Sequence, residues 1–189
     1  MGRGPAAHRA ARLLGISVKV VEPTERRRVV GFVGVAALAT VAVLVADALS
    51  KQAVTAALAD GSVREIVPGW LVLTYVRNTG TAYGLLAGQG WLVLPLSLAA
   101  AVIVPLVLWR GGFWRGHPLL GGLSAGLILG GAFGNLVERI QTGAVTDFIN
   151  VPPIPLFQVF NLADASICVG AVLLLLLSST DRGEPRAES

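Results

Sequence analysis

Long apolar runs dominate the pattern along the chain. Four of them stand out, at residues 29–46, 91–109, 118–137 and 163–179; the first three contain no charged residue and the fourth contains only Asp164. A helix needs about 20 mostly apolar residues to cross the roughly 30 Å hydrocarbon core of a bilayer. The pattern therefore predicts four transmembrane helices. The first run follows three arginines, but it is too long and too far from the N-terminus for a cleaved signal peptide.

The connections between the runs have patterns of their own. Residues 64–77 are rich in Val, Ile, Leu and aromatic residues and contain Pro68-Gly69, which predicts one or two short strands around a turn. Residues 147–161 contain three prolines among large apolar residues, which predicts an extended segment along the membrane interface. The polar ends, residues 1–24 and 181–189, are typical of flexible tails.

The distribution of Lys and Arg predicts the orientation. Seven lie in residues 1–28, two in the second connection and two in the C-terminal tail, whereas the first and third connections hold four between them. Cytoplasmic loops carry the excess of positive charge. We therefore expect both termini in the cytoplasm, with a basic tail at residues 1–28, a membrane domain at residues 29–180 and a second tail at residues 181–189.

Composition agrees with this membrane assignment. The chain is 54% hydrophobic and 14% charged, with a net charge of +4, against about 45–50% apolar and about 25% charged residues in soluble domains. In so apolar a chain, we expect the basic residues to bind anionic lipid headgroups rather than nucleic acid. The one cysteine, Cys168, lies in an apolar run and excludes a disulfide framework and a thiolate metal site.

Polar and ionisable residues gather at one level of the predicted bundle. By the topology above, all of them map to its outer boundary, where each is costly unless paired or solvated. They are Asp47, Lys51, Asn78, Asn135, Glu138, Arg139, Asp147, Asn161 and Asp164. Because they come from different spans and connections, their convergence predicts a functional site.

Each member also has a purely structural interpretation. Asp47 and Lys51 are spaced i,i+4 and can form a structural salt bridge. Asp164 can cap the fourth helix, and Glu138 with Arg139 can simply form the polar end of a span. Asp147 is harder to explain in this way, because it stands among apolar residues with no Lys or Arg nearby in sequence.

The carboxyl groups of Asp147 and Asp164, with no nucleophilic side chain beside them, favour aspartyl acid/base chemistry. Placed a few ångströms apart, they would share one proton near neutral pH. Metal chemistry is disfavoured because His8 and His117 fall on the cytoplasmic side. Nucleophilic serine catalysis is disfavoured because Ser97 and Ser166 lack a base partner. We expect no metal and no cofactor.

Five short motifs in register with the four spans resemble those of the signal peptidase II family, the bacterial lipoprotein signal peptidases. In chain order they are DALSK from Asp47, LTYVRNTGTAYG from Leu73, GNLVER from Gly134, VTDF from Val145 and FNLAD from Phe160. Each motif alone is weak. Together they cover roughly residues 30 to 180 and are specific.

This resemblance implies an aspartyl endopeptidase that cleaves lipoprotein precursors before a cysteine carrying diacylglycerol. It assigns Asp147 and Asp164 as the catalytic pair and Asp47 with Lys51 as a structural pair. The residues that it places around the substrate are Asn78, Gly80, Asn135, Arg139 and Asn161. It further implies four transmembrane helices with a small extracytoplasmic sheet, a monomer in the bacterial cytoplasmic membrane, and inhibition by globomycin-type peptides.

Two positions depart from the family pattern, which commonly has Asp at Glu138 and Phe at Tyr83. Two other functions stay open on the sequence. A small proton-coupled transporter would use the same acids as a relay, although its acids would be spread across membrane depth. A non-catalytic relative would bind lipoproteins without cutting them, which the presence of both Asp147 and Asp164 argues against.

Overall fold

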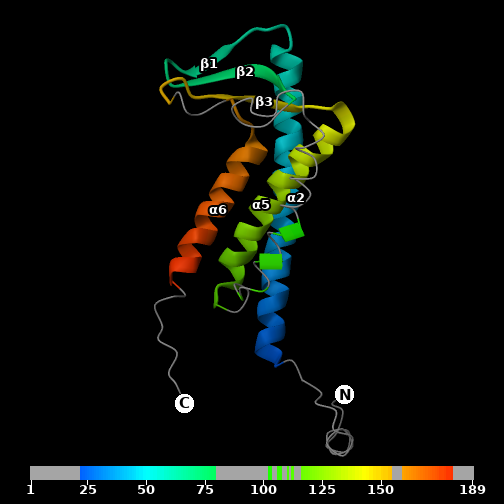
Figure 1. Ribbon diagram of the computed structural model, residues 1–189, viewed down its shortest axis with the longest axis vertical. Helices are drawn as coiled ribbons and strands as arrows, with labels where there is room; N and C mark the ends of the chain where they lie inside the picture. The colour runs from blue at the N-terminus through cyan, green and yellow to red at the C-terminus, as the bar shows by residue number, and fades with distance from the viewer. Residues whose placement is uncertain are drawn as a thin grey trace, which may run out of the picture.

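Three long helices carry a small sheet across one end. The computed structural model describes residues 22–79, 102–103, 106–107, 110, 112, 116–154 and 159–180. Its helices are α2 (Pro23–Leu58), α5 (Pro118–Thr142) and α6 (Leu162–Thr180). Helices α2 and α5 run toward the sheet and α6 runs away from it (Figure 1).

These three helices confirm three of the four predicted spans. Each is long and apolar enough to cross a membrane, whereas the described residues contain no fourth helix of that length. The predicted span at residues 91–109 lies largely outside the described residues. Of it, only Val102, Ile103, Leu106 and Val107 are described; all four are helical and exposed. The fourth span therefore stays a prediction.

Helix α2 is much longer than the apolar run that predicted it. Its 36 residues correspond to about 54 Å at 1.5 Å per residue, well beyond the hydrocarbon thickness. It starts at Pro23, so the end of the predicted tail at residues 1–28 is already helical. At its other end it continues twelve residues past Ala46, and this extension carries Asp47 and Lys51 and supports the sheet.

Glycines bring α2 and α5 close together. Gly122, Gly126, Gly130 and Gly134 recur every fourth residue on α5, and an added Cβ on any of them would meet atoms of α2. At Gly126 that Cβ would lie 2.5 Å from the carbonyl oxygen of Ala36. Small residues at this spacing allow close backbone approach in membrane helix pairs. This four-residue repeat of glycine was not among the features predicted from the sequence.

The sheet has three antiparallel strands, β1 (Arg64–Val67), β2 (Leu71–Asn78) and β3 (Val145–Asn150), in the order β1-β2-β3. The predicted hairpin is confirmed. Its turn has Pro68 and a left-handed Gly69, with φ of 71°, and the Trp70 N–H donates to the Val67 carbonyl at 2.9 Å. A type II turn favours this Pro-Gly pair.

The third strand corrects the prediction for residues 147–161. Residues Val145–Phe148 are buried, so this segment begins as a buried strand paired with β2 rather than as a surface segment. Phe148 packs with Val54 and Leu58 from the last turns of α2. The extension of α2 and the inner face of the sheet thus form one apolar core.

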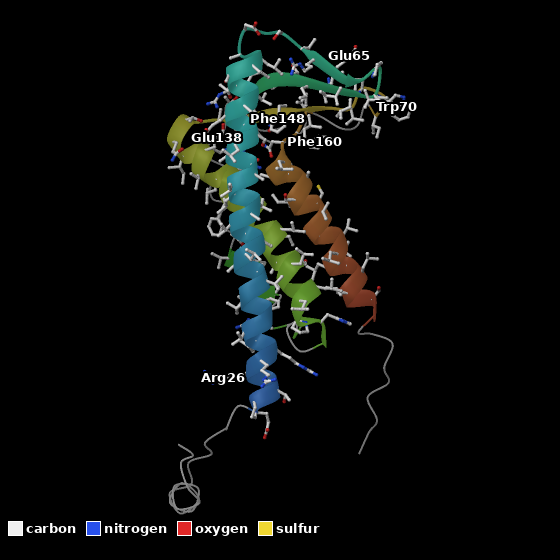
Figure 2. All side chains as sticks on the ribbon, turned by 180° about the vertical axis from the view of Figure 1, so that it is seen from behind. Arg26, Glu65, Trp70, Glu138, Phe148 and Phe160 are labelled. Carbon is white, nitrogen blue, oxygen red and sulfur yellow. The ribbon has the colours of Figure 1, made fainter. Side chains whose placement is uncertain are left out.

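The two ends of the molecule differ in character. Arg26 lies at the free end of α2, whereas Glu65 and Trp70 lie on the hairpin at the opposite end (Figure 2). Between these ends the helices expose large apolar side chains, including Val33, Leu38, Val41, Val45, Phe133, Val137, Val169, Val172, Leu175 and Leu176. Exposed apolar side chains in this number suit a lipid environment.

Candidate active site

A short backbone bridge assembles the site. Phe160 pairs with Ile149 of β3: the Phe160 carbonyl accepts from the N–H groups of Phe148 and Ile149, and the Phe160 N–H donates to the Ile149 carbonyl at 3.0 Å. Figure 2 shows Phe148 and Phe160 between the helix ends and the sheet. The bridge fixes the first turn of α6, and with it Asn161 and Asp164, beside Asp147.

Asn161 joins the two predicted catalytic residues. Its side chain is fully buried, at 0% exposure. Its Nδ2 donates to Asp147 Oδ1 at 2.7 Å, to Asn135 Oδ1 at 3.0 Å and to the Thr146 carbonyl at 3.3 Å. Because this amide carries only two hydrogens for three acceptors, it is fully used within the site.

Asn161 and Asp164 also cap α6 reciprocally. The Asp164 N–H donates to Asn161 Oδ1 at 2.9 Å, and the Asn161 N–H donates to Asp164 Oδ2 at 3.2 Å. This is the arrangement of a capping box. The other oxygen of Asp164, Oδ1, accepts from Asn135 Nδ2 at 2.7 Å. Asp164 thus takes part in capping as predicted, although the N-cap residue itself is Asn161 and Asp164 stands at the third helical position. This role coexists with the placement of Asp164 in the site.

Asp147 is buried, with 2% exposure, and amides reach both of its oxygens. Asn78 Nδ2 donates to Oδ2 at 2.8 Å, opposite the Asn161 bond to Oδ1. Burial raises the pKa of Asp147 to about 6, the nearby Asp164 carboxyl also raises it, and the hydrogen bonds from Asn78 and Asn161 oppose the rise. A carboxyl with such a pKa can exchange a proton near neutral pH.

Lys51, a residue of α2, connects this helix to the candidate site. Its Nζ lies 2.7 Å from Asp47 Oδ2, 2.9 Å from Asn135 Oδ1 and 3.1 Å from Glu138 Oε2. Asp47 Oδ1 in turn accepts from the Ala163 N–H at 3.0 Å. The predicted salt bridge is thus confirmed, and Asp47 also satisfies a donor in the first turn of α6.

Glu138 connects α5 to the sheet. Its Oε1 accepts from the Thr146 hydroxyl at 2.6 Å, from the Thr146 N–H at 3.0 Å and from Arg77 Nη1 at 3.2 Å. The guanidinium of Arg139 interacts electrostatically with Glu138, Asp147 and Asp164. Arg77 and Thr146 were not predicted from the sequence as site residues, although each is the immediate neighbour of one.

The predicted residues therefore come together as one network, with one position untested. The network joins Asp47, Lys51, Asn78, Asn135, Glu138, Arg139, Asp147, Asn161 and Asp164. Gly80 lies outside the described residues, as does Tyr83. In this part of the structure, three cationic side chains (Lys51, Arg77, Arg139) face four carboxyl groups, so the cluster is neutral when one carboxyl holds a proton.

Comparison with known proteins identifies the family. The family profile described as "Signal peptidase (SPase) II" matches residues 39–180. The chain belongs to the signal peptidase II family. It is therefore a peptidase, and the prediction of a hydrolytic enzyme is confirmed. All the described members of the network lie within the matched residues.

Individual relatives agree with this assignment. The chain is 37% identical over 147 residues to the lipoprotein signal peptidase of Bacillus velezensis, covering 77% of this chain and 94% of the relative. It is 41% identical over 139 residues to that of Syntrophomonas wolfei, covering 74% and 89%. A solved structure titled as a bacterial membrane enzyme at 2.3 Å resolution superposes with a TM-score of 0.68 and 27% identity, covering 84% of this chain and 95% of that chain.

Proposed function

We propose that this member of the signal peptidase II family cleaves diacylglyceryl-modified prolipoproteins immediately before the lipidated cysteine, with Asp147 and Asp164 as its catalytic pair. The observation that carries the proposal is the buried Asn161, which binds the Asp147 carboxylate through Nδ2 and the Asp164 backbone through Oδ1. Two carboxyl groups held from different elements by one asparagine form a preorganised acid and base. The electrostatic effect of Asp164 on Asp147 supports the pairing.

The proposed reaction uses one proton shared by the two carboxyl groups. The ionised carboxylate takes a proton from a water molecule as the oxygen of that water attacks the scissile carbonyl carbon. The protonated carboxyl donates its hydrogen to the carbonyl oxygen, giving a tetrahedral intermediate. Collapse of the intermediate breaks the C–N bond, and the leaving amine takes up a proton from the pair. A coupled pair titrates as a unit, so the two roles belong to the pair.

Oxyanion stabilisation falls to Asn78 in this proposal. Asn161 is fully buried and its amide hydrogens face acceptors within the site. Asn78 is only half-buried, stands at the end of β2 and donates its amide hydrogen to Oδ2 of Asp147. It is the better placed of the two to meet a substrate carbonyl. Asn135, Asn161 and Arg139 would then orient the two acids.

The site lies at the end of the bundle that carries the sheet, which suits a lipid-anchored substrate. Acyl chains can stay in the bilayer while the peptide reaches carboxyl groups that water can still approach. With the predicted orientation, this end faces the outside of the cytoplasmic membrane. We propose that the enzyme acts there as a monomer, without metal or cofactor, on substrates entering from the membrane, and that globomycin-type peptides block the same site.

The direct test replaces each acid by its amide. Asp147→Asn and Asp164→Asn, made singly, are expected to abolish conversion of a lipidated precursor to its mature form in membranes, a loss of at least about 100-fold. Asp60→Asn is the matched control, because Asp60 lies just beyond α2 and is exposed. Normal processing by either well-inserted catalytic variant would refute the assignment.

A further inference from the structure

Arg77, at the exposed end of β2, forms several hydrogen bonds to residues beside the candidate active site. Its Nη1 donates to Glu138 Oε1 at 3.2 Å and to the Thr146 hydroxyl at 3.3 Å. Its Nη2 donates to the Thr142 hydroxyl at 2.8 Å and to the Thr142 carbonyl at 3.3 Å. One guanidinium thus holds the last turn of α5 and strand β3 from the neighbouring strand β2.

The position of these contacts favours a cation with a planar fork. Helix α5 ends at Thr142, and the next residue, Gly143, has a left-handed backbone and donates its N–H to the Arg139 carbonyl. The last carbonyls of a helix lack partners and carry partial negative charge, which a cation stabilises. A guanidinium offers several donors in fixed directions, whereas an ammonium is a single point of charge. Arg77 therefore serves as a C-terminal cap for α5 that comes from another element.

The residues next to these contacts include the proposed catalytic ones. Thr146 precedes Asp147, and Arg77 precedes Asn78, which donates to Asp147. Arg77 and Thr146 also face each other in the pairing of β2 with β3. Any shift of the end of β2 relative to α5 would displace both Asp147 and its hydrogen-bond donor.

We propose that Arg77 is a positioning residue for the peptidase reaction, which through Glu138, Thr142 and Thr146 holds the ends of β2 and β3 against α5 and so fixes Asp147 and Asn78. The inference rests on the proposed role of Asp147. The Arg77 side chain is 36% exposed, so its ion pair with Glu138 contributes little to global stability. Its effect is therefore expected in catalysis rather than in folding.

Glu138 is the second half of this arrangement. Its carboxylate meets Lys51 through one oxygen and Thr146 with Arg77 through the other. The family pattern commonly has Asp at this position, which is one methylene shorter, but in this chain it is the length of the Glu side chain that spans from α5 to β3 and reaches Arg77. Glu138→Asp keeps the charge but not the reach, so it tests position separately from charge.

The experiment measures kcat and KM of the purified full-length enzyme on a diacylglyceryl-modified precursor peptide, together with its melting temperature. Arg77→Gln is expected to lower kcat by about tenfold or more with little change in KM, since misplacement by about 1 Å can cost about 100-fold. Arg77→Lys is expected to recover only part of this loss, and Glu138→Asp to reproduce it. The matched control is Arg64→Gln, because Arg64 is an exposed arginine on β1 of the same sheet.

The combined variant completes the test. If the two residues act as a unit, Arg77→Gln with Glu138→Asp lowers kcat no further than either change alone. Wild-type kcat in Arg77→Gln, or a loss no larger than that of Arg64→Gln, would overturn the inference. So would a fall in melting temperature large enough to account for the lost activity. Failure of the proposed function is seen separately, as processing by Asp147→Asn.

Discussion

Asn161 Nδ2 lies 2.7 Å from Asp147 Oδ1, while the same side chain caps the helix that carries Asp164. One fully buried residue therefore serves the start of α6 and the carboxylate of β3 together. This relationship makes the geometry of the two acids depend on a hydrogen-bonded asparagine.

Removal of the Asn161 side chain should weaken both the cap of α6 and the hydrogen bonding of Asp147. Asn161→Ala removes a helix cap and leaves Asp147 Oδ1 with one donor fewer in a buried site. Losing a cap costs about 1 kcal/mol and an unsatisfied buried polar group about 1–3 kcal/mol. We expect a loss of about 2–4 kcal/mol in unfolding free energy and at least about 100-fold in processing. Thermal unfolding in detergent and a processing assay measure these effects; wild-type activity in this variant would contradict the bridge.

The pH dependence should report Asp147. Its pKa is raised to about 6, first by burial, so acidification through about pH 6 protonates it and removes the base from the pair. Below that pH, processing should fall by about tenfold per unit. Initial rates between about pH 4.5 and 8 measure this limb. A rate unchanged down to about pH 4.5 would show that Asp147 does not titrate in the catalytic step.

Asn78→Ala should shift that acid limb in a known direction. Asn78 donates to Asp147 Oδ2 and stabilises the ionised form, so its removal raises the pKa of Asp147 further. The limb is expected to move to higher pH, and the rate at neutral pH to fall. Asn150→Ala, at the other end of β3, is the control and should leave the profile unchanged. A limb that moves to lower pH would refute the role of Asn78.

The buried ion pair of Asp47 and Lys51 predicts that replacing Lys51 alone destabilises the protein more than replacing both residues. Lys51→Met leaves Asp47 and Glu138 without a shared cation in a site where Lys51 itself is only 7% exposed. Breaking a buried ion pair from one side costs about 3–5 kcal/mol, whereas replacing both partners costs less. We expect the double variant Asp47→Asn with Lys51→Met to melt at a higher temperature than Lys51→Met alone. Equal or lower melting of the double variant would contradict the pairing.

The contact between α2 and α5 is testable with a matched pair of glycines. In Gly126→Ala the new Cβ would lie 2.5 Å from the Ala36 carbonyl oxygen, whereas a Cβ at Gly34 of α2 would meet no atom within 4 Å. Overpacking costs about 1–3 kcal/mol, and Ala is favoured over Gly in an open helix position. Gly126→Ala should lower the melting temperature and Gly34→Ala should not. Similar melting of the two variants would exclude close helix contact.

Local patterns in the sequence predicted much of this protein. Runs of apolar residues predicted three helices that the structure describes, because crossing a membrane requires length and apolarity within one segment. Pro68-Gly69 predicted the hairpin turn, because the conformation of such a turn depends on those two residues. The i,i+4 spacing predicted the bridge between Asp47 and Lys51, and the motifs identified the residues that gather at one end.

Only the tertiary structure decided how those residues meet. The Phe160–Ile149 bridge that brings Asn161 to Asp147 joins segments whose pairing no local pattern specifies. The same holds for the contacts of Arg77 with Glu138 and Thr142, which are more than sixty residues away in sequence. The local sequence pattern indicates which polar side chains would be costly to bury. The long-range pairing of strands with helix ends determines which groups satisfy them, and that is a property of the folded chain alone.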